Sequence, residues 1–174
     1  MLQRGQGPTT LVYDGTLHEG RAHGQGRITW PDRSHYTGDW QNGQRAGRGT
    51  QVFATGNRHE GDWRADVPHG RGTLTTTTGL RYEGDWKDGQ RTGQGTFTMR
   101  DGTRYTGAWL NGKQEGHGTQ VFSNGSRYEG QWKNGLPNGP GTGYGAVTGR
   151  IFRNGCLRTE EYTAAFGVPD TACQ

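Results

Sequence analysis

The stretch Tyr82–Gly95 reads YEGDWKDGQRTGQG, and close copies of it recur every 23 residues along the chain. Each copy starts with tyrosine, except that histidine takes the third start; the starting residues are Tyr13, Tyr36, His59, Tyr82, Tyr105 and Tyr128. Four residues later stands tryptophan, except for leucine in the first copy: Leu17, Trp40, Trp63, Trp86, Trp109 and Trp132. A G-x-G pair follows at a fixed offset, from Gly24/Gly26 to Gly139/Gly141. A constant period of this length indicates a repeat array.

The composition, taken by itself, is that of a disordered chain, because only 27% of the 174 residues are hydrophobic and the mean hydropathy is −1.05. Six Trp, seven Tyr and five Phe argue against disorder, since disordered chains are poor in aromatic residues. An array in which each unit contacts only its neighbours also needs no large central core. We therefore interpret the chain as a folded array.

Each unit has the pattern of a β-hairpin. Aromatic and charged residues alternate from Tyr82 to Trp86, which is the period of a strand with two different faces. Asp88-Gly89 is typical of a tight hairpin turn, and a second strand is predicted over residues 94–99, closed by a turn at Asp101-Gly102. The predicted fold is all-β, an elongated, single-layer, twisted antiparallel sheet of tandem hairpins. Its strand glycines should share a face with the rings, so that the rings lie over the backbone.

The repeats divide the chain into four parts. Residues 1–12 are interpreted as an imperfect N-terminal cap or partial repeat, and residues 13–145 as six repeats. Residues 146–158 have the pattern of a degenerate half-repeat. Residues 159–174 are interpreted as a C-terminal cap or tail, and the threonine and acids at the start of residues 159–167 predict a short capping helix there.

The pattern Y-x-G-x-W-x-x-G-x-x-x-G-x-G resembles the MORN repeat (membrane occupation and recognition nexus). The resemblance covers residues 13–141 in six copies, of which the first departs at Leu17 and the third at His59 and Asp66. It implies an all-β array of hairpins that serves as a scaffold or docking surface. Protein interaction or self-association is the role that the resemblance implies, and the family name also suggests lipid binding.

Catalytic residues, cofactors and metal sites are not predicted. The six histidines lack metal-ligand spacing, and His23 and His69, which share one repeat position, should lie four strands apart, roughly 19 Å. The glycine-rich residues 139–145 lack the strand, the helix and the G-K-[ST] sequence of a phosphate loop. Cys156 and Cys173 are interpreted as free thiols, with a disulfide as the alternative.

The net charge of +4 permits attraction to anionic partners, but many charges should be paired within the sheet. On the polar face an arginine column (Arg58, Arg81, Arg104 and Arg127) stands beside two acidic columns (Asp14, Glu60, Glu83 and Glu129; Asp39, Asp62 and Asp85). Cross-strand pairing accounts for these columns without a ligand. Excess positive charge lies in the turns at Arg45, Arg91 and Lys113, the candidate lipid-binding residues. No nucleic acid is expected as a partner, because no aromatic residues interleave with these basic side chains.

The aromatic face is the candidate partner-binding surface, and its rows are Tyr36, Trp40, Trp63, Tyr82, Trp86, Tyr105, Trp109, Tyr128 and Trp132. Packing between units should hide part of these rings, and the remainder should form an exposed groove. We expect a non-catalytic scaffold that binds a protein segment or a second copy of itself there, with anionic phospholipid as the alternative partner. The sequence has no apolar segment of the length of a membrane span or signal, so a cytoplasmic protein is expected, membrane-associated under the alternative.

Overall fold

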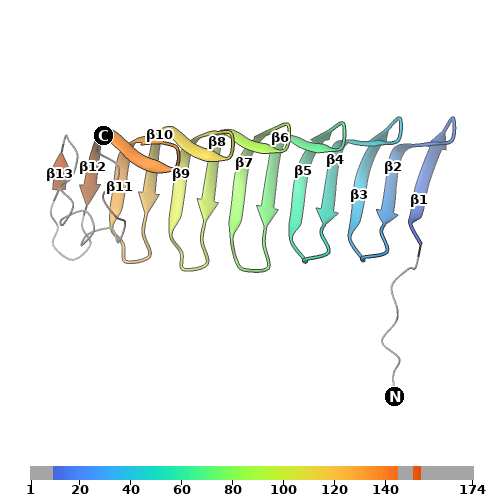
Figure 1. The fold of residues 1–174 in the computed structure, drawn as a ribbon, viewed down its shortest axis with the longest axis horizontal. Helices are drawn as coiled ribbons and strands as arrows, with labels where there is room; N and C mark the ends of the chain where they lie inside the picture. Colours follow the sequence, from blue (N-terminus) through green and yellow to red (C-terminus); the bar gives the residue numbers. More distant parts are fainter. Residues whose placement is uncertain (1–9, 145–150, 154–174) are drawn as a thin grey trace, which may run out of the picture. The chain divides into compact units, whose positions relative to one another are not determined.

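The computed structural model describes residues 10–144 and 151–153, and the regular structure in them is entirely β-strand. The chain divides into two compact units, residues 1–89 and residues 90–174. The first unit contains β1 (Val12–His18), β2 (Arg21–Thr29), β3 (His35–Gln41), β4 (Gln44–Val52), β5 (Arg58–Arg64), β6 (Val67–Thr75) and β7 (Arg81–Lys87). The second contains β8 (Gln90–Thr98), β9 (Arg104–Leu110), β10 (Lys113–Val121), β11 (Arg127–Lys133), β12 (Leu136–Tyr144) and β13 (Ile151–Arg153) (Figure 1).

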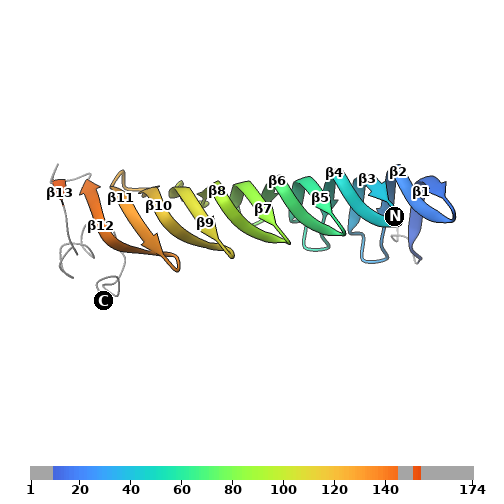
Figure 2. The same cartoon turned by 90° about the horizontal axis from the view of Figure 1, so that it is seen from above.

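Within each unit every strand pairs antiparallel with the next strand of the chain. Figures 1 and 2 show the strands of the first unit side by side in a single layer. The predicted all-β fold of tandem antiparallel hairpins is therefore confirmed. The described residues contain no helix that could span a membrane.

The tight turns have the conformation that their sequences predict. Asn42 and Gly43 have φ values of 52° and 84°, and Asp88 and Gly89 have values of 50° and 78°. Positive φ at both central residues defines the hairpin turn whose twist matches that of the flanking strands. Ala65-Asp66 takes the same form without glycine, at φ values of 47° and 68°.

The second strand of each hairpin begins earlier than the sequence predicts: β8 starts at Gln90, directly after the turn, and not at residue 94. The reason is that the first glycine of each G-x-G pair forms a β-bulge and does not precede the strand. Gly47 in β4 has a φ of 52°, and the pairing of β3 with β4 shifts between Gly38 and Trp40. A bulge inserts one residue while pairing continues on both sides, so the strand includes the residues before it.

The second glycine of the pair lies beneath the tyrosine ring of its own repeat, except in the third repeat, where the ring above Gly72 is that of His59. A Cβ atom at Gly49 would lie 2.1 Å from the hydroxyl oxygen of Tyr36 and 2.3 Å from its Cζ. In the second unit a Cβ atom at Gly118 would lie 2.3 Å from the hydroxyl oxygen of Tyr105. The predicted reason for the strand glycines, close approach of a ring to the backbone, is confirmed.

Each tryptophan joins its repeat to the preceding one. The Nε1–H of Trp63 donates to the carbonyl oxygen of Gly49, 14 residues earlier, at 3.1 Å. The same bond recurs at the other four tryptophans of the repeat position, again at 3.1 Å: Trp40 to Gly26, Trp86 to Gly72, Trp109 to Gly95 and Trp132 to Gly118. These bonds place one indole over each hairpin boundary.

The C-terminal predictions are only partly covered by the described residues. Residues 151–153 form β13, which pairs antiparallel with β12, and this strand falls within the predicted half-repeat. The predicted capping helix over residues 159–167, residues 1–9 of the predicted cap or partial repeat over residues 1–12, and both cysteines lie outside the described residues.

Candidate functional site

The nine aromatic residues predicted to line a groove form the buried core. Their exposed fractions run from 0% at Tyr36 to 8% at Trp86. The expectation that part of this ring surface stays exposed is wrong for all nine: Tyr36, Trp40, Trp63, Tyr82, Trp86, Tyr105, Trp109, Tyr128 and Trp132. A partner that contacts this side of the sheet must meet other side chains.

The rings are buried because the strand bends toward them. Tyr36 and Trp40 are four residues apart on β3, which is about 13 Å along a flat strand. Their ring centroids are only 5.3 Å apart, with the rings perpendicular. Trp40 also makes an edge-to-face contact with Tyr13 at 5.6 Å, and Trp63 makes one with Tyr36 at 5.3 Å. Each tryptophan ring therefore packs between the ring of its own repeat and that of the preceding one, and such pairs add to the burial energy.

His59 replaces tyrosine in the third repeat and is the unusual member of the core. It is 1% exposed, its Nε2 has no hydrogen-bond partner among the described residues, and it lies edge-to-face between Trp63 and Trp86 at 5.2 and 4.8 Å. At the tyrosine positions the hydroxyl instead donates to the carbonyl three residues on, as Tyr82 does to Asp85 at 3.0 Å. Burial, and then the charge of Arg45, lower the pKa of His59 from 6.5 to about 4.

The buried His59 should make the protein sensitive to acid. The pKa of His59 is lower in the folded protein than in the unfolded chain, so between pH 6.5 and 4 the proton binds mainly to the unfolded chain. The free energy of unfolding therefore falls as the pH drops from 6.5 toward 4, and His59 does not change it above pH 6.5. The expected loss is up to about 3 kcal/mol. His59→Tyr should remove it and, by restoring the missing hydrogen bond, add about 1 kcal/mol at neutral pH. Urea unfolding at a series of pH values measures both effects.

His59→Phe is the matched control, since phenylalanine can neither titrate nor donate the hydrogen bond. It should abolish the extra acid sensitivity without the gain at neutral pH. If its stability falls with pH as steeply as that of the unmodified protein between pH 6.5 and 4, His59 is not the source of the sensitivity.

Two of the three candidate lipid-binding residues pack against the core. The Arg45 guanidinium lies 4.6 Å from the ring centroid of Trp63, and it donates to the backbone carbonyl of Asp66 at 2.7 Å and to the side chain of Gln51 at 2.8 Å. Its Nε also pairs with the Asp66 carboxylate at 3.1 Å. These contacts explain the half-buried position of Arg45, because cation–π contacts and hydrogen bonds replace part of its hydration.

Arg91 repeats this arrangement in the second unit. Its guanidinium lies 4.6 Å from the Trp109 ring centroid and donates to the carbonyl of Gly112 at 2.7 Å. Lys113 alone of the three is exposed. The prediction that Arg45 and Arg91 form an exposed basic rim is therefore corrected: both are structural residues that cover tryptophan rings.

The predicted charge pairing on the polar face is present: two acids of the second acidic column pair across strands, as Asp62 does with Arg48, whereas the arginine column pairs along its own strands. Arg81 pairs with Glu83 at 2.6 Å along the same strand, and Arg58–Glu60 and Arg127–Glu129 are equivalent pairs. In the second unit Arg104 has Thr106 at the position of the acid. The same-strand pairs thus engage three of the four arginines of this column.

Carboxylates of the second acidic column accept hydrogen bonds from backbone N–H groups at the bulges. The Asp39 carboxylate accepts the backbone N–H of Arg48 at 2.7 Å, and the Asp62 carboxylate accepts that of Arg71 at 2.9 Å. A backbone N–H freed by a bulge is thereby satisfied. Ala108 and Gln131 take this position in the second unit. These acids have a structural role that the sequence pattern does not reveal.

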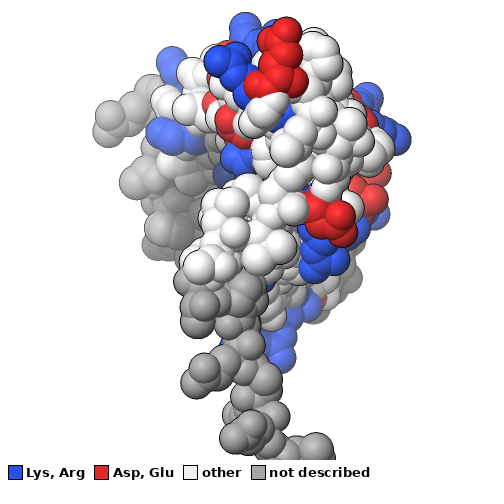
Figure 3. Space-filling model, turned by 90° about the vertical axis from the view of Figure 1, so that its right-hand side faces the viewer, with Lys and Arg blue, Asp and Glu red and all other residues white. Residues whose placement is uncertain are grey.

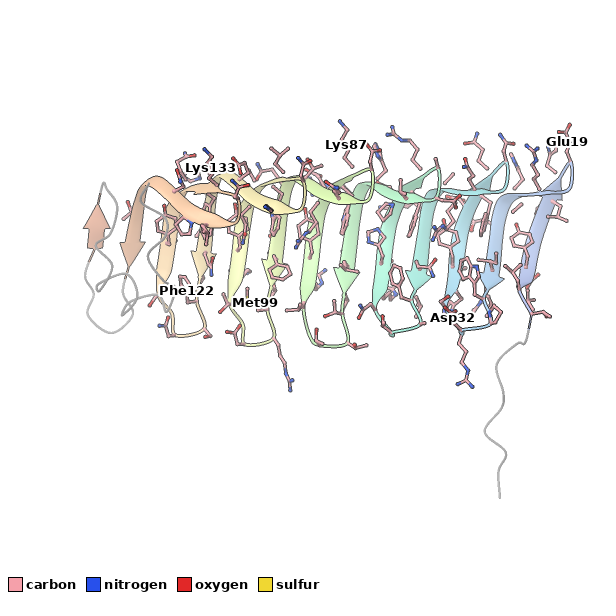
Figure 4. All side chains as sticks on the ribbon, in the orientation of Figure 1. Glu19, Asp32, Lys87, Met99, Phe122 and Lys133 are labelled. Carbon is pink, nitrogen blue, oxygen red and sulfur yellow. The ribbon has the colours of Figure 1, made fainter. Side chains whose placement is uncertain are left out.

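Apolar side chains stay exposed at loops that close the repeats, and Leu17, at the tryptophan position of the first repeat, is also exposed. We call the four side chains that follow the second strands the closing-loop hydrophobic residues: Trp30, Phe53, Met99 and Phe122. Phe53 is 41% and Met99 39% exposed, whereas Trp30 packs against the buried cluster of the first unit. In Figure 4, Met99 and Phe122 lie at the closing-loop end of the second unit, and Lys133 lies at its hairpin-turn end.

The opposite face of the first unit holds a polar channel of about 510 Å³. Its floor is backbone, at Gly38, Gly49, Gly61, Gly72 and Gly84, which pair in sequence across β3 to β7. One wall carries Thr37, Thr50, Glu60, Thr73 and Glu83, and the other carries Gln25, Arg48 and Arg71. The sequence analysis did not predict this channel. Its signal in the sequence is a polar residue on each side of the second glycine of a G-x-G pair, as Arg48 and Thr50 flank Gly49.

Charges of both signs lie next to each other on the surface. Seen from the β1 end, acidic and basic side chains adjoin one another along the edges of the sheet (Figure 3). In the described part of the chain, no group of three or more His, Cys, Asp or Glu side chains is placed to hold a metal ion.

Comparison with known proteins gives a family match. A family model described as MORN repeat matches residues 13–35, 36–58, 59–81, 82–104, 105–127 and 128–142. Among solved structures the chain is similar to the SAS-4 (dCPAP) TCP domain of Drosophila melanogaster in complex with a proline-rich motif of Ana2 (dSTIL). The identity is 11%, the TM-score is 0.48, and the match covers 74% of this chain and 70% of that chain. This similarity is too low to carry a functional argument. No curated protein matches the chain.

Proposed function

Because the chain belongs to the MORN-repeat family, with six repeats over residues 13–142, we propose that it is a non-catalytic scaffold that binds a protein segment or a second copy of itself. The observation that carries the proposal is the division of the ring-bearing face. Within each unit the core rings are buried by packing between repeats, while the closing-loop side chains Phe53 of the first unit and Met99 of the second stay exposed. Exposed apolar side chains on a rigid support are typical of protein interfaces.

Membrane recruitment is the weaker proposal. Arg45 and Arg91 are engaged with rings and backbone carbonyls, so of the three candidate residues Lys113 alone is available to phospholipid. A single lysine near an anionic surface contributes only about 1 kcal/mol. Co-sedimentation of the unmodified protein with anionic vesicles would favour this alternative over protein binding.

The double variant Phe53→Asp/Met99→Asp should weaken partner capture or self-association about tenfold or more, because each change places a charge in the apolar contact. Both side chains are more than one third exposed, so the fold should persist. Quantitative affinity capture with mass spectrometry measures partner binding, and analytical ultracentrifugation measures self-association.

Leu110→Asp is the matched control. Leu110 is 53% exposed but lies at the hairpin-turn end of β9, away from the closing loops. It should leave capture and self-association unchanged. Equal losses in the control and in the double variant would contradict the assignment of the closing-loop residues to the interface.

A further inference from the structure

The polar channel of the first unit has the dimensions of one extended peptide. Its two walls come from residues two positions apart on the same strand, as Arg48 and Thr50 do on either side of Gly49. That spacing is roughly 7 Å, which admits a single chain running across the strands. The backbone floor carries no side chain that would obstruct such a chain, because a Cβ at Gly49 would point into the Tyr36 ring on the other face.

The wall formed by Gln25, Arg48 and Arg71 presents two guanidinium groups that are each held at Nε. Nε of Arg48 lies 3.3 Å from the Asp62 carboxylate, and Nε of Arg71 lies 2.9 Å from that of Asp85. Both arginine side chains are otherwise exposed, at 81% and 71%, and their Nη groups have no partner among the described residues. A guanidinium fixed at Nε with free Nη groups is suited to bind a carboxylate of a ligand.

The wall of threonine and glutamate residues presents two carboxylates, those of Glu60 and Glu83. Glu60 and Glu83 each use Oε2 to pair with an arginine of their own strand, which leaves Oε1 free within the described part of the unit. Both side chains are 57% exposed. A polyanion along the channel would meet these acids, so lipid headgroups and nucleic acid fit it poorly. The charges instead suit a ligand with acidic groups on one side and basic groups on the other.

The spacing of these charges matches a polyproline-II helix. On each wall the charged residue recurs every second strand, which is about 9.6 Å. A polyproline-II helix has three residues per turn and a rise of about 3.1 Å per residue, so its side chains repeat every 9.3 Å or so. A ligand in this conformation would therefore keep one side facing the arginines and another facing the glutamates over successive repeats.

We propose that the polar channel binds a polyproline-II segment of a partner protein in which acidic and basic residues each recur at every third position. The acidic residues of the segment pair with Arg48 and Arg71, and its basic residues pair with Glu60 and Glu83. This site lies on the face of the first unit opposite to its closing-loop residues Trp30 and Phe53, so it is a second binding surface, beyond the proposed function.

A fluorescein-labelled peptide of four Glu-Lys-Pro triplets tests the proposal by fluorescence anisotropy at low salt. It should bind the unmodified protein, and Arg48→Glu/Arg71→Glu should weaken binding about tenfold. Arg21→Glu/Lys87→Glu gives the same change in net charge at exposed positions outside the channel, and it should bind as the unmodified protein does. A peptide of the same composition in blocks, four Glu, four Lys and four Pro, should bind several-fold more weakly.

Several results would overturn the proposal. The proposal fails if the triplet peptide does not bind at low salt, or if the two double variants weaken its binding equally. It also fails if the block peptide binds as well as the triplet peptide, or if heparin or anionic vesicles bind more tightly than the triplet peptide in a way that depends on Arg48 and Arg71. If circular dichroism shows that Arg48→Glu/Arg71→Glu is unfolded, Arg48→Gln/Arg71→Gln takes its place. Phe53→Asp/Met99→Asp should leave peptide binding unchanged, so failure here is distinguishable from failure of the proposed function.

Discussion

Replacing Gly49 by alanine should destabilise the protein by about 3 kcal/mol, an unusually large effect for a single methyl group. The new Cβ would lie within 2.5 Å of three atoms of the Tyr36 side chain. Tyr36 is completely buried and donates to the Asp39 carbonyl, so its ring has no open space to move into. Urea unfolding followed by circular dichroism measures the loss.

The third repeat supplies a natural control for this prediction. Gly72 is the counterpart of Gly49, but it faces His59, and a Cβ there would lie 2.9 Å from the nearest ring atom. Gly72→Ala should therefore cost less than Gly49→Ala, and it should cost more once His59→Tyr is also present. Equal costs at the two glycines in the unmodified protein would show that the tyrosine ring does not set the requirement for glycine.

Trp63→Ala is expected to cost about 4 kcal/mol. The indole is 4% exposed and contacts the rings of Tyr36 and His59 as well as the Arg45 guanidinium. Its removal leaves a cavity at the boundary between two hairpins and takes the Nε1 donor away from the Gly49 carbonyl. The midpoint of urea unfolding should shift accordingly.

Two controls separate the contributions of this tryptophan. Trp63→Phe keeps a ring in place but removes the Nε1–H donor and part of the buried indole volume, so an intermediate loss of about 2 kcal/mol is expected. Leu110→Ala removes an apolar side chain that is 53% exposed and should change stability by less than about 0.5 kcal/mol. A Trp63→Ala protein as stable as Leu110→Ala would contradict the assignment of the tryptophans to the core.

The fold could be predicted from the sequence because its signals are local. Asn42-Gly43 and Asp88-Gly89 specify their turns through their own backbone preferences, and the alternation from Tyr82 to Trp86 assigns the two faces without reference to other strands. Because the pattern recurs every 23 residues, the prediction of one hairpin applies to every repeat and predicts the array. None of these signals requires knowledge of how a strand bends.

The candidate site could not be predicted to the same degree, because it depends on that bend. In a flat strand Tyr36 and Trp40 would stay apart and partly exposed, whereas the bulge brings their centroids to 5.3 Å and buries both rings. The same curvature lets Arg45 reach from the turn to cover Trp63. Sequence position alone places Arg45 on a basic rim, and only the path of the backbone shows that it is a packing residue.

The bond from each indole to the preceding repeat has a consequence for how such chains change in evolution. Each hairpin depends on its predecessor for a carbonyl acceptor and on its successor for an indole, so the smallest change that leaves every remaining contact intact is gain or loss of a whole 23-residue unit. A one-residue insertion within a unit would instead break the link. Length should therefore vary between related chains in steps of one hairpin, about 9.6 Å of sheet.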